Sequence, residues 1–113
     1  MIREFDDNRF LHQFPKVELV AGDACRTIPA YVETHRHLSV SLLFLDFDLY
    51  EPTKAALDHL LPRMPKGAVL AFDEINNANW PGETEALIRH LGTLNGMPIR
   101  KFDFDPNIAY AVL

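Results

Sequence analysis

Residues 39–53 read Ser39-Val40-Ser41-Leu42-Leu43-Phe44-Leu45-Asp46-Phe47-Asp48-Leu49-Tyr50-Glu51-Pro52-Thr53. An apolar run of strand length therefore ends directly before two carboxylates. The pattern recurs at residues 67–74, which read Gly67-Ala68-Val69-Leu70-Ala71-Phe72-Asp73-Glu74. Short apolar runs that are bounded by turn signals, with a helical pattern between them, are typical of parallel strands in an α/β sheet. Ligands bind beyond the carboxyl ends of such strands, so we expect these acids to share one site.

Helical and extended patterns alternate along the rest of the chain. They predict helices at residues 6–14, 27–37, 51–61 and 81–91, strands at 17–21, 39–45 and 68–72, and a hairpin of strands 99–104 and 108–113 around Asp105-Pro106-Asn107. The first helix would place Phe10, Leu11 and Phe14 on one face. Thr27 is the expected cap of the second helix, and Gly92 ends the last one. This order predicts an α/β three-layer sandwich, closed by an antiparallel hairpin, in a single domain over residues 1–113.

The composition excludes several classes of protein. The chain has 113 residues, of which 48% are hydrophobic and 24% charged, as in ordinary globular proteins. Its net charge of −5 argues against a general binder of nucleic-acid backbones, which shows a basic face. No run approaches the length that spans a bilayer, and the first residues do not resemble a signal peptide. Cys25 is the only cysteine, so we expect a protein of the reducing cytoplasm.

The acids that follow the two strands have the chemistry of a metal site. Oxygens of Asp46, Asp73 and Glu74 are hard ligands of the kind that Mg²⁺ or Ca²⁺ prefers. A cation there would lower the pKa of a substrate hydroxyl, and Asp48 could then take the proton as a general base. The alternative is structural: Asp46 or Asp48 caps the next helix, and Asp73 is a turn residue at a strand end.

No glycine-rich phosphate loop occurs among the five glycines of the chain. A nucleotide-binding α/β domain normally opens with a strand and such a loop, whereas this chain opens with a predicted helix. We therefore expect the sequence to be the second part of a longer domain.

Several segments carry a resemblance to a known family. These are residues 42–57, 62–69 and 72–74, and the run Trp80-Pro81-Gly82-Glu83-Thr84-Glu85-Ala86. Over about residues 16–113 the chain resembles the C-terminal portion of macrocin O-methyltransferases, which are sugar methyltransferases that depend on S-adenosylmethionine and Mg²⁺. The resemblance implies a class I methyltransferase fold, which is Rossmann-like, lacking its first two strands.

The resemblance also implies a role for particular residues. Asp46, Asp73 and Glu74 correspond to the metal ligands and Asp48 to the general base, although the family commonly has aspartate at position 74. Gly22-Asp23-Ala24 resembles the loop at the adenine side of the cofactor, so Asp23 and Ala24 are expected cofactor contacts.

Two aromatic residues, Tyr50 and Trp80, flank the acidic loops and would line a sugar or sulfonium pocket, or else serve as core or rim residues.

Two further functions compete with methyl transfer to a sugar or sugar-nucleotide-like acceptor. Asp46-x-Asp48 alone would suit a metal-dependent glycosyltransferase, and a truncated domain would suit a non-catalytic module. The strands 17–21 and 39–45 would each keep an unpaired edge, which would be covered either by direct pairing of the two strands or by a homodimer or an exchanged segment. Of these we expect a homo-oligomer.

Overall fold

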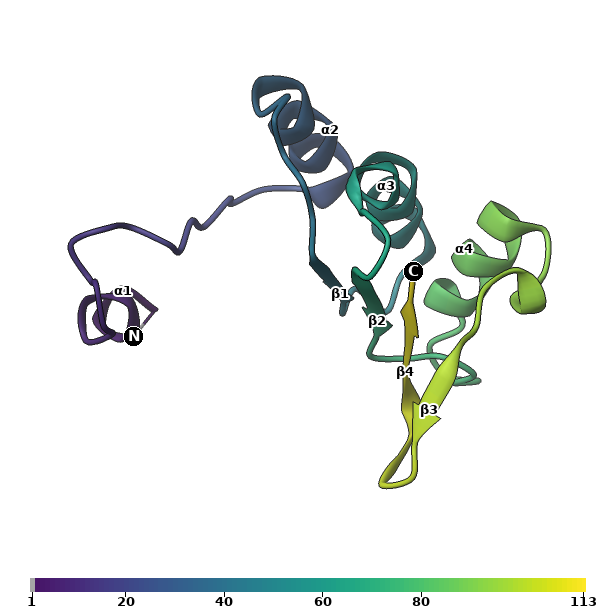
Figure 1. The fold of residues 1–113 in the computed structure, drawn as a ribbon. Coiled ribbons are helices and arrows are strands. Elements are labelled where there is room, and N and C mark those ends of the chain that lie inside the picture. The colour runs from purple at the N-terminus through teal and green to yellow at the C-terminus, as the bar shows by residue number, and fades with distance from the viewer. Residues whose placement is uncertain (1) are drawn as a thin grey trace.

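The computed structural model describes residues 2–113 (Figure 1). Its helices are α1 (Ile2–Asp7), α2 (Ala24–Thr34), α3 (Tyr50–Leu60) and α4 (Gly82–Leu91), with short 3-10 helices η1 (Leu61–Arg63) and η2 (Leu94–Gly96). The strands β1 (Leu42–Leu45), β2 (Val69–Phe72), β3 (Arg100–Phe102) and β4 (Asp105–Val112) form a sheet in the order β1-β2-β4-β3. β1 and β2 are parallel, whereas β4 is antiparallel to both β2 and β3. The predicted α/β sheet with a closing antiparallel hairpin is confirmed.

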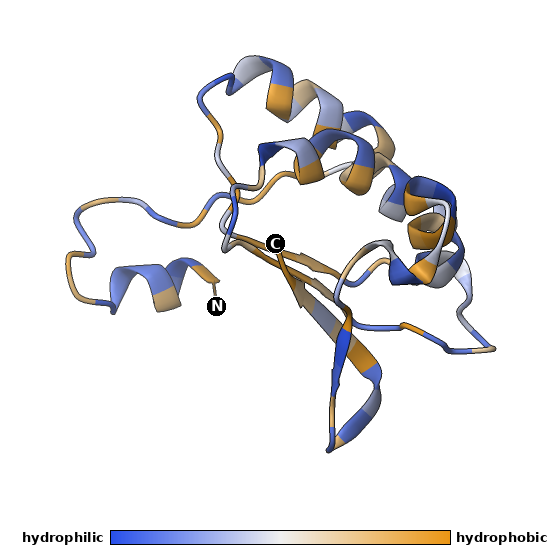
Figure 2. Cartoon of the chain, turned by 45° about the vertical axis from the view of Figure 1, so that its right-hand side comes forward, coloured by the Kyte–Doolittle hydropathy of each residue, from blue (hydrophilic) through white to orange (hydrophobic). Residues whose placement is uncertain are grey.

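The hydrophobic core lies between this sheet and three helices. α2, α3 and α4 lie side by side over one face of the sheet (Figure 1). Figure 2 shows β1 and β2 as hydrophobic along their length, with hydrophobic stripes on the helices. The side chains at the centre of this core are at most 1% exposed, namely Leu45, Leu57, Leu70, Phe72 and Leu87. Burial of these large side chains, each worth about 1.5–3 kcal/mol, fixes the helices against the strand ends.

The opposite face of the sheet is open in residues 2–113. Side chains alternate along β1, so Leu43 and Leu45 enter the core, while Leu42 and Phe44 are 62% and 50% exposed. β1 is also an edge strand. The described residues therefore form two of the three expected layers, a sheet and the helices on one side of it.

The N-terminal segment differs from its prediction. Helix α1 ends at Asp7, and Leu11 has a φ of 60°, a left-handed conformation that interrupts a helix. Phe10 and Phe14 are 89% and 58% exposed. Residues 17–21 are extended but form no strand, because no other strand among residues 2–113 lies beside them to share backbone hydrogen bonds.

Two further boundaries moved for local reasons. Asp23, rather than Thr27, caps α2, because its Oδ1 accepts a hydrogen bond from the N–H of Cys25 at 2.9 Å. β1 begins at Leu42, because the N–H of Val40 donates to the carbonyl oxygen of Arg63 at 2.8 Å instead of joining a sheet.

The hairpin turns earlier than predicted. Phe102 pairs with Asp105, so the turn consists of Asp103 and Phe104 rather than residues 105–107. Aromatic stacking accounts for this position, because the ring of Phe102 packs against those of Phe104 and Tyr110 with centroids 5.0 and 4.9 Å apart.

Candidate functional site

Asp46 and Asp73 lie side by side because their strands end together. β1 and β2 run parallel, and their last residues, Leu45 and Phe72, are paired. The N–H of Asp73 donates to the carbonyl oxygen of Leu45 at 2.9 Å, which continues the pairing beyond the strands. One carboxylate oxygen from each of Asp46, Asp48 and Asp73 lies within 4.8 Å of the others. We call these three residues the aspartate triad.

Glu74 lies next to the triad and is not part of it. Its carboxylate accepts a hydrogen bond from the side-chain amide of Asn77. Asp48, the residue that the sequence assigns to proton transfer, takes the third place in the triad. Its φ of 60° is a left-handed conformation, which aspartate adopts more readily than most residues other than glycine. The roles of Glu74 as ligand and of Asp48 as base therefore remain predictions.

The triad is electrostatically unfavourable by itself. Burial raises the pKa of Asp73, and the neighbouring charges of Asp46 and Glu74 raise it further. Three carboxylates are a hard oxygen donor set, which fits a divalent cation such as Mg²⁺. Two oxygens on opposite sides of Mg²⁺ lie at most about 4.2 Å apart, so oxygens of the triad would need to approach one another by no more than roughly 0.6 Å. The residues present thus fit a cation after small side-chain adjustment.

A buried carboxylate connects the two acidic loops. Glu83, in the first turn of α4, is 0% exposed. Its Oε1 accepts hydrogen bonds from the N–H groups of Phe47 at 3.1 Å and Asp48 at 3.2 Å, and its Oε2 accepts one from the N–H of Glu74 at 3.0 Å. Burial raises the pKa of Glu83, and the three N–H donors oppose that shift. The residue satisfies three backbone groups that would otherwise lack partners.

The neighbours of Glu83 in α4 add two contacts with the same loops. A Cβ atom on Gly82 would lie 2.4 Å from the backbone nitrogen of Tyr50 and 2.7 Å from the carbonyl oxygen of Asp48. Only glycine therefore allows α4 to approach so closely. Thr84 Oγ1 accepts a hydrogen bond at 2.9 Å from the N–H of Asn76, which has a left-handed φ of 63°.

The remaining predicted site residues lie outside the triad. Asp23 is exposed and caps α2, and Ala24 is the first residue of that helix. The guanidinium carbon of Arg89 lies 5.4 Å from the centroid of the Tyr50 ring, which is a cation–π contact between α4 and α3. Trp80 is 47% exposed.

Sequence reasoning missed Glu83, Gly82 and Asn77 as parts of the site. A glutamate in a first helical turn reads as an ordinary partner of the helix dipole. The available signal was the glycine before it, because Pro81-Gly82 at the start of a helix suggests a close backbone approach.

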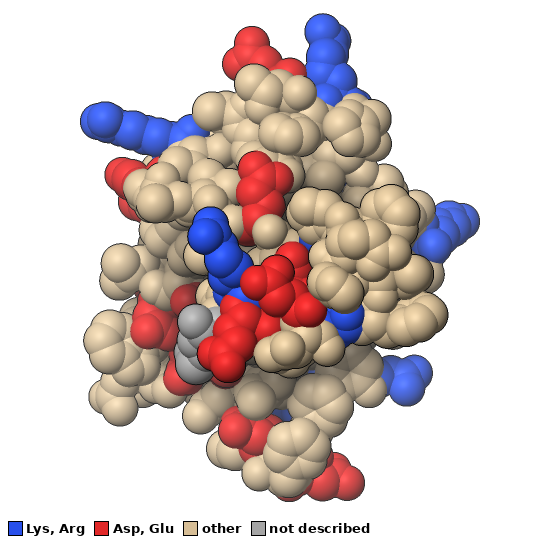
Figure 3. Space-filling model, turned by 90° about the vertical axis from the view of Figure 1, so that its left-hand side faces the viewer, with Lys and Arg blue, Asp and Glu red and all other residues tan. Residues whose placement is uncertain are grey.

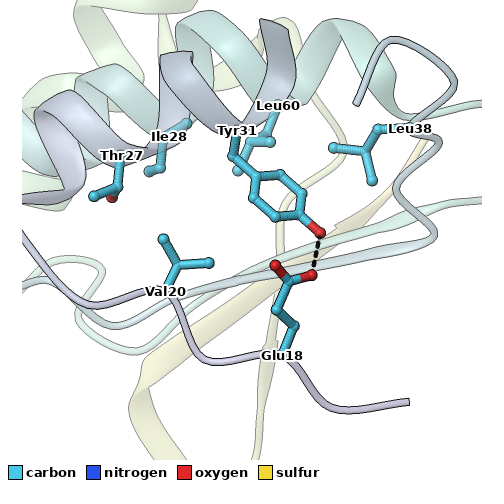
Figure 4. Close-up of a pocket in the computed structure, with 7 residues that line it drawn as sticks. All are labelled: Glu18, Val20, Thr27, Ile28, Tyr31, Leu38 and Leu60. Atoms are coloured by element: carbon cyan, nitrogen blue, oxygen red, sulfur yellow. Dashed lines mark hydrogen bonds between the residues drawn. The ribbon is translucent and has the colours of Figure 1, made fainter. Parts of the chain in front are cut away.

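A separate pocket of about 220 Å³ lies beside α2. The Tyr31 hydroxyl points to Glu18 and donates a 2.9 Å hydrogen bond to its Oε2 (Figure 4). That bond raises the pKa of Tyr31. The other lining side chains are mostly apolar: Val20, Thr27, Ile28, Leu38 and Leu60. The Tyr31–Glu18 bond joins the extended segment before α2 to that helix.

Acidic side chains gather on the side of the molecule where α1 lies (Figure 3). Helix α1 contributes Glu4, Asp6 and Asp7, and Arg9 pairs with Asp6. Such a face repels phosphate backbones. None of the helices within residues 2–113 combines the length and the apolar composition that crossing a membrane requires.

The fold is that of α/β methyltransferases, represented by a portion that ends in the antiparallel hairpin. The apo structure of CalS11, a TDP-rhamnose 3′-O-methyltransferase of calicheamicin biosynthesis, matches with a TM-score of 0.90 and 36% identity over 98% of this chain and 47% of that one. Another CalS11 structure, of the calicheamicin methyltransferase, matches with a TM-score of 0.91 and 36% identity over 98% and 43% of the two chains. This chain thus spans about half the length of CalS11.

More distant similarity extends to the O-methyltransferase NovP, with a TM-score of 0.55 and 21% identity over 66% of this chain and 29% of that one, which supports the fold alone. No protein-family model matches the chain, and no curated protein matches it. The likeness is therefore to sugar O-methyltransferases, at a coarser level than the macrocin family that the sequence suggests.

Proposed function

We propose that this chain provides the metal- and acceptor-binding part of a sugar O-methyltransferase that uses S-adenosylmethionine. The observation that carries the proposal is the aspartate triad at the carboxyl ends of β1 and β2. The likeness to CalS11 at 36% identity over 98% of the chain supports the same function. The macrocin-type family and a sugar or sugar-nucleotide acceptor are the finer parts of this proposal.

The chain's own carboxylates suit proton removal from an acceptor hydroxyl. Mg²⁺ held by Asp46 and Asp73, together with Glu74, would lower the pKa of that hydroxyl. Asp48 then accepts the hydroxyl proton as the general base. Because Asp48 belongs to the triad, it also competes with Glu74 for the place of third ligand.

The cofactor part of the proposal rests on fewer residues. Asp23 and Ala24, at the start of α2, would contact the adenine end of S-adenosylmethionine. No glycine-rich loop follows a strand within residues 2–113. These residues alone do not make a complete cofactor site, and we derive no step of methyl transfer from them.

A thermal-shift experiment on the 113-residue chain tests the function. Mn²⁺ should raise the melting temperature, because it binds the folded state. S-adenosylhomocysteine should raise it less, because Asp23 and Ala24 alone do not make a complete cofactor site. If only the combination of a nucleoside diphosphate and Mn²⁺ raised the melting temperature, the result would instead favour the glycosyltransferase. No shift with any of these ligands would favour the non-catalytic module, for which the open sheet face is the supporting observation.

Methyl transfer itself is tested by mass spectrometry of TDP-rhamnose after incubation with S-adenosylmethionine and Mg²⁺. In a complete version of the enzyme, with the glycine-rich cofactor loop supplied, we expect the acceptor to gain one methyl group, and Asp48→Asn to lower the rate by about 10²–10⁴-fold. Glu85→Gln, which changes an exposed carboxylate of α4, is the control and should leave the rate unchanged. Near-normal turnover of Asp48→Asn would remove Asp48 from the mechanism.

We also propose that the open sheet face makes the protein a homo-oligomer in the cytoplasm, where Cys25 stays reduced. Leu42 and Phe44 are exposed on the edge strand β1, and such edges recruit another chain. Light scattering at micromolar concentration should show an oligomer that Phe44→Lys dissociates and that Phe104→Lys, at the 81% exposed hairpin residue, leaves intact. A wild-type monomer would contradict this proposal.

A further inference from the structure

We infer that Glu83 is a positioning residue that holds both acidic loops in the geometry of the aspartate triad. The carboxylate of Glu83 is fully buried, yet its hydrogen-bond partners among residues 2–113 include no basic side chain. Its hydrogen bonds go to the backbone of Phe47 and Asp48 in one loop and of Glu74 in the other. A single carboxylate therefore joins two segments that follow different strands. The functional consequence rests on the proposed metal site, whereas the positioning role does not.

The backbone conformation of the loops shows why such a contact is needed. Asp48 and Asn76, one in each loop, have left-handed φ values of 60° and 63°. Aspartate and asparagine adopt this conformation more readily than other residues that have a Cβ atom, but it is still uncommon for them, so contacts that hold their N–H groups help to maintain it. The N–H of Asp48 is held by Glu83, and the N–H of Asn76 is held by Thr84. Both unusual residues are thus fixed by adjacent side chains of the first turn of α4.

The carboxylate of Glu83 is suited to this task because it only accepts hydrogen bonds. Its two oxygens take three N–H donors, and no N–H of its own opposes them. In Glu83→Gln one oxygen becomes an NH₂ group, which would face a backbone donor. The substitution keeps the size of the side chain and removes at least one of the three bonds. The loops would then relax from the arrangement that gathers the triad.

Backbone amide exchange tests the positioning role directly. In Glu83→Gln we expect the amides of Phe47, Asp48 and Glu74 to exchange at least tenfold faster than in the wild type. The control Glu85→Gln alters an exposed carboxylate on the same helix and should leave these rates unchanged. If Glu83→Gln fails to fold, Thr84→Val provides the second test, with faster exchange expected at Asn76. Unchanged protection of these amides in a folded variant would overturn the inference.

Mn²⁺ affinity tests the consequence for the triad. We expect Glu83→Gln to weaken Mn²⁺ binding by tenfold or more, measured by electron paramagnetic resonance well below the melting temperature. Leu87→Ala, which removes a buried core side chain of the same helix, controls for lost stability and should keep the wild-type affinity while folded. Wild-type Mn²⁺ affinity in Glu83→Gln would contradict the inference. If the wild-type chain bound no Mn²⁺, the proposed function would fail, and amide exchange would still decide the role of Glu83.

Discussion

Gly82→Ala should loosen the contact between α4 and the first acidic loop. The added Cβ atom would lie 2.4 Å from the backbone nitrogen of Tyr50, where ordinary contacts begin near 3.4 Å, so the helix end must move by about 1 Å. Overpacking of this kind costs about 1–3 kcal/mol, and the better helix propensity of alanine returns less than about 1 kcal/mol. We therefore expect a net loss of roughly 1–2 kcal/mol, which lowers the melting temperature by about 5–10 °C.

The assay combines urea unfolding with Mn²⁺ titration of the folded protein. Movement of the helix end would also displace Glu83, so Mn²⁺ affinity should fall together with stability. Gly96→Ala is the matched control, because its Cβ would meet only side-chain atoms, at 3.6 Å or more. It should change the free energy of unfolding by less than about 0.5 kcal/mol. Wild-type stability and Mn²⁺ affinity in Gly82→Ala would refute the reasoning.

Two charge variants have opposite expected effects on stability. Asp73→Asn should raise the free energy of unfolding of the metal-free protein at neutral pH, because the raised pKa of Asp73 means that its ionised form destabilises the fold. That destabilisation grows as pH rises from the unfolded-state pKa through the raised folded-state value, so urea unfolding at acidic pH should show no gain. Asp58→Asn should lower stability, because Lys54, and to a lesser extent His90, lower the pKa of Asp58. The loss should be at most about 1 kcal/mol for this exposed pair. It should be seen at pH values above the unfolded-state pKa of Asp58 and should disappear at pH values below the lowered folded-state pKa.

The sequence was sufficient to locate the strand ends and the acids that follow them. An apolar run such as Leu42–Leu45 that stops at Asp46 has few interpretations, and two such runs in a row imply parallel strands. That Asp46 and Asp73 lie side by side then followed from the parallel arrangement of the two strands alone. Asp48 was also expected at this site, as the general base. Its place as the third member of the triad was not predicted, because it depends on a left-handed backbone conformation at Asp48.

Two other features depended on partners that are distant in sequence. Residues 17–21 have the alternation of a strand, yet strand formation needs a neighbour, and none is present among residues 2–113. Glu83 reads as a surface acid of a first helical turn, and its burial depends on residues 36 positions away in the chain. Local propensity contains no information about either contact.

The electrostatics of the site separate the role of Glu83 from that of the three carboxylates of the aspartate triad. Burial raises the pKa of Glu83, but three N–H donors oppose that shift and partly compensate its charge without a cation. In the aspartate triad no N–H donor of residues 2–113 opposes the shift of Asp73, and the like charges of Asp46 and Glu74 add to burial in raising its pKa. The loops can therefore take their shape before a cation binds, which leaves the triad poised to gain from it. Preorganisation of this kind lowers the cost of binding, and here it depends on α4 docking through Gly82 and Glu83 rather than on the ligands themselves.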